Sequence, residues 1–373
     1  MTIKLGTEML KEELDKLVKI IPKKEIKPVL SGILFDLKDE KLYMKATDME
    51  NSMCVTDAPV EAAGDNVSFV VDAKMIHNII KSTTESVVTF VLGKVLVIKA
   101  GHSTATLPVM DAEDFPELQF SDEEVIEYKV KHSALKTAID KVSEYASKDE
   151  TARHLNSVLF DFRTSSLLLV AADSFRMSVV EIMQENETER EFLLNLKGVK
   201  QLRKILDSIP PQELTEEREV KLRLSSSALY LLTHRMQYAV RLTDANFPPW
   251  EDVIPDSFNT TVEANAKELR QEMEIPALMA PDAGDTMLLE ILDNRMHIKA
   301  NSPDRGQANA VADVEKDGRD VTIAFDPEFI LTALENIDGA AVMSFVDGDS
   351  ALKINPKGDE QYVQIIMPVK QRR

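Results

Sequence analysis

Asp48 and Asp173 are the residues of this chain whose positions best fit acid–base or metal chemistry. Each closes a strand-like apolar run and precedes a polar turn. A carboxylate acts as a general acid or a metal ligand only where partner groups converge on it. Aspartate is also common at turns, because its side chain accepts hydrogen bonds from nearby backbone amides. We therefore expect Asp48 and Asp173 to cap turns, and a carboxylate-dependent enzyme is the alternative.

Other residue patterns predict no catalytic or metal site. The six histidines are scattered, and no two stand at metal-ligand spacing. The glycine motifs GxxxxGK[ST], GxGxxG and GxSxG do not occur, and Gly is only 12 of 373 residues, so a phosphate-cradling loop is hard to build. The single cysteine, Cys54, lies in an apolar run where a buried thiol is expected. We predict no catalytic residue, no metal and no cofactor.

Composition predicts a cytoplasmic protein that does not enter membranes. Hydrophobic residues make up 44% and charged residues 29% of the chain, which is typical of a globular protein. No apolar run approaches 18 residues, and the N-terminus lacks the apolar region of a signal peptide. One cysteine fits a reducing compartment. The net charge of −20 makes the chain a poor general binder of polyanions, so any surface for nucleic acid must gather its cations locally.

The first third of the chain recurs in its second third, 125 residues later. LSGILF at residues 30–35 returns as LNSVLF at residues 155–160, and Asp48 corresponds to Asp173. The correspondence extends over a helix-like and a strand-like segment. Its period is far longer than that of solenoid repeats and fits a whole domain. We therefore predict a duplicated domain.

Each repeat predicts the same order of elements, and a third copy follows the segment FPPWEDV. Apolar residues at helical spacing predict a first helix at residues 10–21, 135–146 and about 269–277. Paired strands are expected at residues 32–46, 157–171 and 287–300. A second helix is expected at residues 74–82, 198–207 and 327–336, the last with Asp326 as N-cap and Pro327 at its first position. Pro276 predicts that the third repeat's first helix is short or kinked. The expected fold is α+β, with domains at 1–125, 126–250 and 251–373.

Basic residues recur on the first helix of the first two repeats. Lys16, Lys19 and Lys23 lie opposite the apolar stripe at 100° per residue, and Lys141 and Lys148 occupy the places of Lys16 and Lys23. A mixed, solvated helix face is the alternative. The repetition favours a basic surface shared by equivalent helices.

Taken together, these motifs resemble the bacterial sliding clamp family, the beta subunit of DNA polymerase III. The motifs that carry the resemblance are KPVLSGILF at 27–35, ATDME at 46–50, LNSVLF at 155–160, ADSFRM at 172–177, FPPWEDV at 247–253 and YVQIIMPV at 362–369. The resemblance implies three clamp domains per chain, each with two helices packed on antiparallel sheets. It also implies a head-to-tail homodimer that forms a ring around duplex DNA and has no catalytic role. A closed ring holds DNA topologically, so its hole needs cations but no base readout.

The resemblance also implies site residues and partners. The residues expected to face DNA are Lys16, Lys23, Lys24, Lys141, Lys148, Arg153, Lys197 and Lys200. The residues expected to form a pocket for Gln-Leu-x-Leu-Phe-like peptides are Leu155, Ala172, Ser174, Phe175, Arg176, Met177, Pro248, Val253, Ile365, Ile366, Met367, Pro368 and Val369. Leu278 and Met279 are the expected dimer contacts. The partners are the replicative polymerase, the clamp loader and other proteins with a clamp-binding motif, at the nucleoid in the cytoplasm.

Three departures from the family leave the peptide preference open. The family commonly has His where Phe175 stands and Arg where Asp252 stands, and residues 370–373 extend past the usual end. A three-domain interaction scaffold that never encircles DNA is the second alternative to a clamp.

Overall fold

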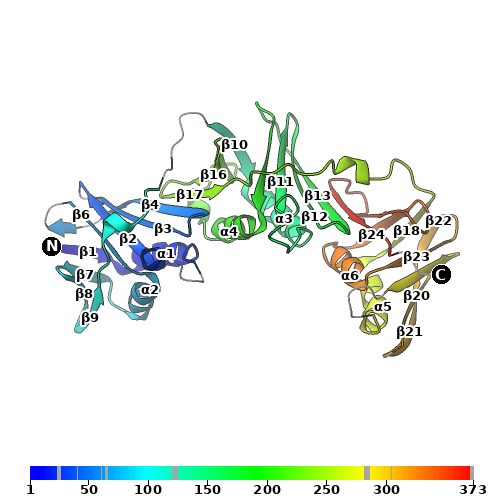
Figure 1. Cartoon of the computed structure of the whole chain (residues 1–373), viewed down its shortest axis with the longest axis horizontal. Helices are drawn as coiled ribbons and strands as arrows, with labels where there is room; N and C mark the ends of the chain where they lie inside the picture. The colour runs from blue at the N-terminus through cyan, green and yellow to red at the C-terminus, as the bar shows by residue number, and fades with distance from the viewer. Residues whose placement is uncertain are drawn as a thin grey trace. The chain divides into compact units, whose positions relative to one another are not determined.

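The computed structural model divides the chain into two compact units, which are described separately (Figure 1). The first unit contains Met1–Lys136 and Lys197–Leu242, and the second contains Thr137–Leu196 and Thr243–Arg373. The structure describes residues 1–22, 27–39, 41–59, 61–63, 66–118, 120, 125–280, 286–303 and 305–369. Among these residues, no helix is both long and apolar enough to cross a bilayer.

The first unit is built on two antiparallel sheets. One has the order β5 (Glu61–Ala63), β1 (Thr2–Gly6), β7 (Val87–Leu92), β8 (Val95–Ala100), β9 (Ser103–Pro108). The other has the order β10 (Ile126–Lys131), β15 (Glu219–Leu224), β16 (Ala228–Leu232), β17 (Met236–Arg241), β4 (Asn51–Pro59), β3 (Lys41–Thr47), β2 (Gly32–Lys38), β6 (Val67–Asp72). Strands of the first and second repeats therefore share one sheet.

The second unit has the same plan. Its larger sheet has the order β14 (Arg190–Asn195), β11 (Ser157–Arg163), β12 (Ser166–Ala172), β13 (Arg176–Met183), β26 (Tyr362–Ile366), β25 (Leu352–Pro356), β24 (Ala340–Phe345), β18 (Thr260–Asn265), β22 (Glu315–Gly318). Its smaller sheet has the order β21 (Gly306–Asp313), β20 (Arg295–Ser302), β19 (Met287–Leu292), β23 (Val321–Phe325). The predicted class, α+β with antiparallel sheets, is confirmed.

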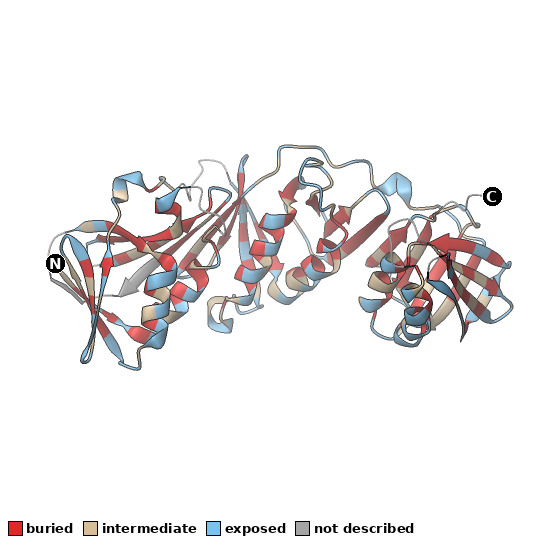
Figure 2. Ribbon diagram, turned by 60° about the horizontal axis from the view of Figure 1, so that its bottom comes forward, coloured by how far each residue is buried: buried red, intermediate tan, exposed pale blue. Residues whose placement is uncertain are grey.

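Two helices per repeat appear where the sequence predicts them. They are α1 (Thr7–Leu17), α2 (Ala73–Ser82), α3 (His132–Ser143), α4 (Leu196–Asp207), α5 (Ala266–Leu278) and α6 (Pro327–Glu335). The helices are buried on one side and exposed on the other (Figure 2). The Asp326 side chain accepts the N–H of Glu328 as the predicted N-cap of α6. Short 3-10 helices lie at Pro28–Ser31, Ala112–Asp114, Pro211–Glu213 and Glu251–Val253.

The expectation of a short helix around Pro276 is wrong. With 13 residues, α5 is longer than α1, and Pro276 lies in its last turn. Proline removes one backbone donor, and in the last turn of α5 this costs a single helical hydrogen bond without ending the helix earlier. The helix therefore keeps its full length before it ends at Leu278.

The same strand junction links successive repeats. In the first unit β4 pairs with β17, with Asn51 opposite Val240. In the second unit β13 pairs with β26, with Arg176 opposite Ile366. Asn51 and Arg176 are 125 residues apart and each begins its strand, so the two junctions start at corresponding residues.

The hydrophobic cores of the first two repeats also correspond. Phe35 stacks on Phe69 with ring centroids 5.3 Å apart, and Phe160 stacks on Phe192 at 5.2 Å. In both pairs the residues face each other on neighbouring strands. Such aromatic cross-strand pairs stabilise sheet packing beyond simple burial.

Cys54 gives a first test of the fold. Its thiol is buried in β4, as expected, and burial raises its pKa to about 11. At pH 8 roughly one thiol in a thousand is then ionised, whereas roughly a quarter of exposed thiols are ionised at that pH. The ionised thiolate is the reactive form. We expect the folded chain to react with Ellman's reagent at least about a hundredfold more slowly than the chain in guanidinium chloride. Equal rates in the two states would contradict the buried position of Cys54.

Candidate functional site

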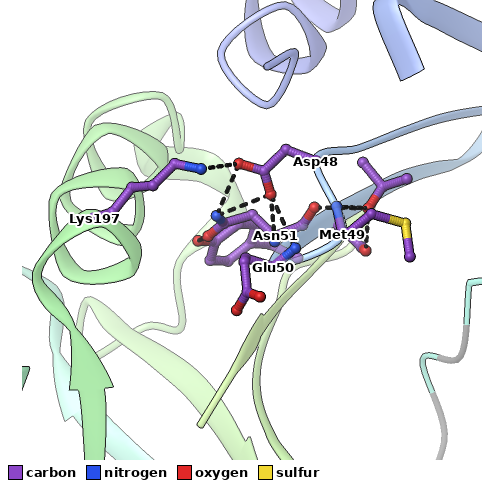
Figure 3. A network of polar contacts seen from close by, with 8 residues as sticks. Asp48, Met49, Glu50, Asn51 and Lys197 are labelled. Carbon is purple, nitrogen blue, oxygen red and sulfur yellow. Dashed lines mark hydrogen bonds and ion pairs between the residues drawn. The ribbon is translucent and has the colours of Figure 1, made fainter. Parts of the chain in front are cut away.

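Asp48 and Asp173 each organise the turn that precedes a junction strand. Oδ1 of Asp48 accepts the N–H groups of Glu50, at 3.1 Å, and Asn51, at 2.7 Å (Figure 3). Oδ1 of Asp173 likewise accepts the N–H groups of Phe175, at 3.2 Å, and Arg176, at 3.1 Å. The residues after them, Met49 and Ser174, have positive φ of 77° and 74°. The predicted turn-capping role is confirmed for both aspartates.

The two turns are held by different cations. Lys197 of α4 donates to Oδ2 of Asp48 at 2.8 Å, and Asn51 in turn accepts the Tyr238 hydroxyl at 2.6 Å. Oδ2 of Asp173 instead accepts Nε of Arg176 at 3.0 Å. In the part of the chain that the structure describes, no group of three or more His, Cys, Asp and Glu side chains could hold a metal ion.

A cavity of about 400 Å³ lies in the second unit, where the start of β13 meets the end of β26. The predicted pocket residues that line it are Leu155, Ala172, Ser174, Arg176, Met177, Pro248, Val253, Ile365 and Met367. Residues that the sequence reasoning missed complete the wall: His154, Phe247, Pro249 and Trp250. Three of these four residues lie in the FPPWEDV segment, so the apolar residues of that segment could have indicated its place in the cavity wall. The lining is mostly apolar, as anchors of a short peptide require.

Four predicted pocket residues do not line the cavity. Ile366 is fully buried, because strand residues alternate between faces and Ile365 takes the face toward the cavity. Phe175 is exposed beside it, and its ring stacks on Phe329 of α6 at 6.3 Å. Pro368 and Val369 lie beyond it, and the N–H of Val369 donates to the carbonyl of Ala324 at 2.8 Å. Residues 370–373 lie outside the described residues.

Arg176 is the charged residue of the cavity wall, and its position is fixed from several sides. Besides Asp173, it donates through Nη2 to the backbone carbonyl of Glu144 at 2.9 Å. Its guanidinium lies over the rings of Tyr145, at 5.1 Å, and Phe329, at 4.6 Å. Cation–π contacts of a desolvated arginine are stabilising. The wall is therefore rigid where polar groups of a ligand would meet it.

Predicted DNA-facing cations gather on one face of α4. Lys197 and Lys200 are exposed there, and Lys204 continues the same face at the helical spacing i, i+3, i+7. Sequence reasoning missed Lys204, although its spacing was the signal. Lys148 and Arg153, in the second unit, are exposed as well.

The prediction that Lys16 lies on an exposed basic face is wrong. Lys16 is buried, with its Nζ 3.1 Å from Glu13 and 3.9 Å from Glu213. The short helix Pro211–Glu213 covers this side of α1, which periodicity within α1 could not reveal. The residues exposed on α1 are instead mainly acidic and include Glu8, Glu12 and Asp15.

Lys141 is not free on the surface either. Its Nζ lies 4.0 Å from the ring centroid of Tyr362, and burial lowers the pKa of the amine. The cation–π contact turns the side chain toward β26, so the prediction that Lys141 projects outward is wrong. Lys23 and Lys24 lie outside the described residues.

The candidate dimer contacts lie at the end of α5. Leu278 is 65% exposed, and Met279 is half-buried. Ile275, which the sequence reasoning did not single out, is also 65% exposed and lies one turn before Leu278. Two large apolar side chains are therefore exposed side by side on α5.

Three family models, all of the DNA polymerase III beta subunit, match successive parts of this chain. The N-terminal domain model matches residues 1–119, the central domain model matches residues 129–249, and the C-terminal domain model matches residues 251–370. The proposed third repeat is thus matched by a domain model of the same subunit as the first two.

Relatives and solved structures agree with these matches. A relative named "Beta sliding clamp" from Vibrio cholerae is 26% identical over 92% of both chains. The crystal structure of the DNA polymerase III beta subunit from Thermotoga maritima is 33% identical, with a TM-score of 0.90 and complete coverage of both chains. The subunit from Pseudomonas aeruginosa, 22% identical with a TM-score of 0.92, has the same fold over the full length of both chains.

The matches to all three domains and the full-length likeness at 33% identity together establish the family. The chain belongs to the DNA polymerase III beta subunit family and is a DNA sliding clamp, a non-catalytic subunit that tethers a DNA polymerase to its template.

Proposed function

We propose that two copies of this chain close head to tail into a ring around duplex DNA, with clamp domains at 1–125, 126–250 and 251–373. The observation that carries this proposal is the repeated strand junction. The fourth strand of one repeat pairs with the last strand of the next, in β4–β17 and in β13–β26. Two strands hold the same positions in their repeats but have no such partner in the described sheets: β21, the fourth strand of the third repeat, and β9, the last strand of the first.

Within the described sheets, β9 and β21 are both edge strands. An edge strand exposes unpaired N–H and C=O groups, which a further strand can satisfy. Pairing β21 of one copy with β9 of another would repeat the junction a third time. Two copies would then pair both edges, and a closed head-to-tail dimer leaves neither β9 nor β21 without a partner strand.

The exposed apolar residues of α5 support the same contact. In the second unit α5 packs beside β20 and β21, so Ile275 and Leu278 belong to the helix next to the free edge. Apolar side chains that flank a pairing edge stabilise association through burial. We therefore assign Leu278, Ile275 and Met279 to the interface between copies.

The proposed ring contacts DNA through few cations. Lys200 and Lys204 of α4 present positive charge beside Lys197, which pairs with Asp48, and Lys148 and Arg153 add to it in the second unit. A net charge of −20 discourages DNA from binding elsewhere on the molecule. Contacts with phosphates carry no sequence information, which suits a clamp that slides. The proposed place of action is the nucleoid, in the cytoplasm.

The cavity in the second unit is the proposed docking site for partner peptides. Its apolar wall suits the Leu and Phe anchors of a Gln-Leu-x-Leu-Phe-like segment, and Arg176 supplies a fixed polar edge. The polymerase, the clamp loader and other partners would use the same cavity in turn. Binding of a short flexible peptide loses ordering entropy, so the dissociation constant should be on the order of micromolar.

The interface prediction concerns Leu278→Asp. A carboxylate at the centre of an apolar contact remains without a partner and opposes association. We expect the parent chain to sediment at about twice 41.8 kDa at micromolar concentration and the variant at about 41.8 kDa. Met183→Asp, which changes an exposed residue at the far end of β13, is the control and should remain dimeric. If the Leu278→Asp variant were still dimeric, α5 would not be part of the interface.

The DNA prediction concerns the double variant Lys200→Gln, Lys204→Gln. Direct DNA affinity should fall, and the slope of log K against log salt should flatten by about 0.9 for each phosphate that the variant no longer neutralises. Lys94→Gln, Lys129→Gln is a control with the same charge change away from α4 and should keep the parental slope. Both variants should stay on a closed circular DNA after loading and leave once it is cut. Release of the α4 variant from the intact circle would argue against a topological link.

The peptide prediction concerns Met367→Asp. Met367 is 39% exposed on the cavity wall, so the fold should tolerate the change, whereas a peptide anchor would meet an unpaired charge. The loss should be about 2 kcal/mol, or more than tenfold in affinity, for a fluorescent Gln-Leu-x-Leu-Phe peptide. Met183→Asp serves again as the control. Parental affinity in the Met367 variant would place the peptide elsewhere.

A further inference from the structure

A second cavity, of about 310 Å³, lies at the first strand junction, wholly within the first unit. Its walls are formed by the turn between β3 and β4, the start of β4, the start of β16, the end of β17 and the segment at residues 116–118. The peptide cavity has the same construction at the second junction, from the β12–β13 turn, the end of β26 and the segment around residues 247–250.

The two cavities correspond position by position. Thr47 and Ser52 of the first stand 125 residues before Ala172 and Met177 of the second. The strand registers likewise match Ala239 with Ile365. Arg241 and Met367 each lie two residues after this pair, so they correspond as well. Arg241 donates its N–H to the Glu50 carbonyl at 3.0 Å, and Met367 donates to the Phe175 carbonyl at 2.8 Å.

The chemistry of the first cavity is different. Where the second has Ala172, Met177 and Ile365, the first has two hydroxyl residues and an alanine. The hydroxyls of Thr47 and Ser52 lie 2.9 Å apart and bond to each other, so the floor is polar and already satisfied. Leu and Phe anchors would gain less there, because a polar floor replaces the apolar side chains that the second cavity has at these positions.

Charged side chains surround the entrance. Glu50, Glu117 and Arg241 line the cavity and are exposed, and none makes an ion pair with another described residue. Two carboxylates against one guanidinium give this rim a net negative charge. Such a rim favours a ligand with a basic group and repels an acidic one.

The wall that carries Met49 and Glu50 is held rigidly. Asp48 caps the turn, Lys197 pairs with Asp48, and Tyr238 donates to Asn51 (Figure 3). A preorganised wall reduces the entropy that a ligand must overcome on binding.

We propose that this cavity is a second docking site, for an extended peptide segment that carries a lysine or arginine next to a small apolar residue. The inference rests on the proposed function in one respect, the assignment of the corresponding second cavity to peptides. The two junctions of one chain would then sort partners by chemistry, with apolar anchors at the second and basic segments at the first.

Methionine methyl NMR of the full-length protein can observe both sites at once. Met49 reports on the first cavity, and Met177 and Met367 report on the second. The Met49 signal is identified by its loss in Met49→Leu. The probes are capped Gly-Arg-Ala-Val-Gly, its matched control Gly-Glu-Ala-Val-Gly, and a Gln-Leu-x-Leu-Phe peptide.

We expect the arginine peptide to shift Met49 alone, more weakly as salt is added, and the Gln-Leu-x-Leu-Phe peptide to shift Met177 and Met367 alone. Glu50→Gln, Glu117→Gln should weaken the arginine peptide about fivefold and leave the other peptide unchanged. The proposal is overturned if millimolar arginine peptide leaves Met49 unshifted, if the glutamate peptide shifts it equally, or if the double variant binds as the parent does. A shift of Met49 without any response of Met177 and Met367 to Gln-Leu-x-Leu-Phe would support this site and refute the other.

Discussion

Antiparallel pairing between the fourth strand of one repeat and the last strand of the next is the interaction on which this structure depends. It fuses strands of successive repeats into continuous sheets, in β4–β17 and β13–β26, with one register. The alternation of buried and exposed side chains defines the register, because a slip of one residue would turn every buried side chain outward. The same pairing leaves β9 and β21 as unpaired counterparts. In the proposed ring, these two edge strands would pair with each other as a third junction.

Each junction also creates a cavity next to it. A turn capped by aspartate precedes the pairing strand, and the following inter-repeat segment closes the other side. Because the backbone is repeated, the side chains alone decide what each cavity accepts. Ala172, Met177 and Ile365 make the second apolar, whereas Thr47, Ser52 and Ala239 leave the first polar. Duplication thus supplied the same backbone arrangement at both junctions, in which different side chains could evolve.

Much of the fold could be predicted because duplication makes local signals redundant. The offset of 125 residues aligned helices, hairpins and both turn aspartates before any contact was known. The errors came from contacts between distant segments. Lys16 is covered by Glu213, and Lys141 is drawn onto Tyr362, neither of which periodicity within one helix can reveal. Ile366 was predicted to line the cavity, but neighbouring strand residues face opposite sides of the sheet, and Ile365 takes the side toward the cavity. In the FPPW segment, the sequence reasoning assigned only Pro248 to the cavity, whereas the folded structure shows that Phe247, Pro249 and Trp250 also form its wall.

The central claim, that one repeated junction builds the whole assembly, is tested most directly by particle shape. Electron microscopy of the purified full-length chain at micromolar concentration would image every junction together. The account predicts closed rings of six lobes with a central hole, formed by two chains. Three-lobed arcs that never close, or pairs of chains joined through other surfaces, would contradict it.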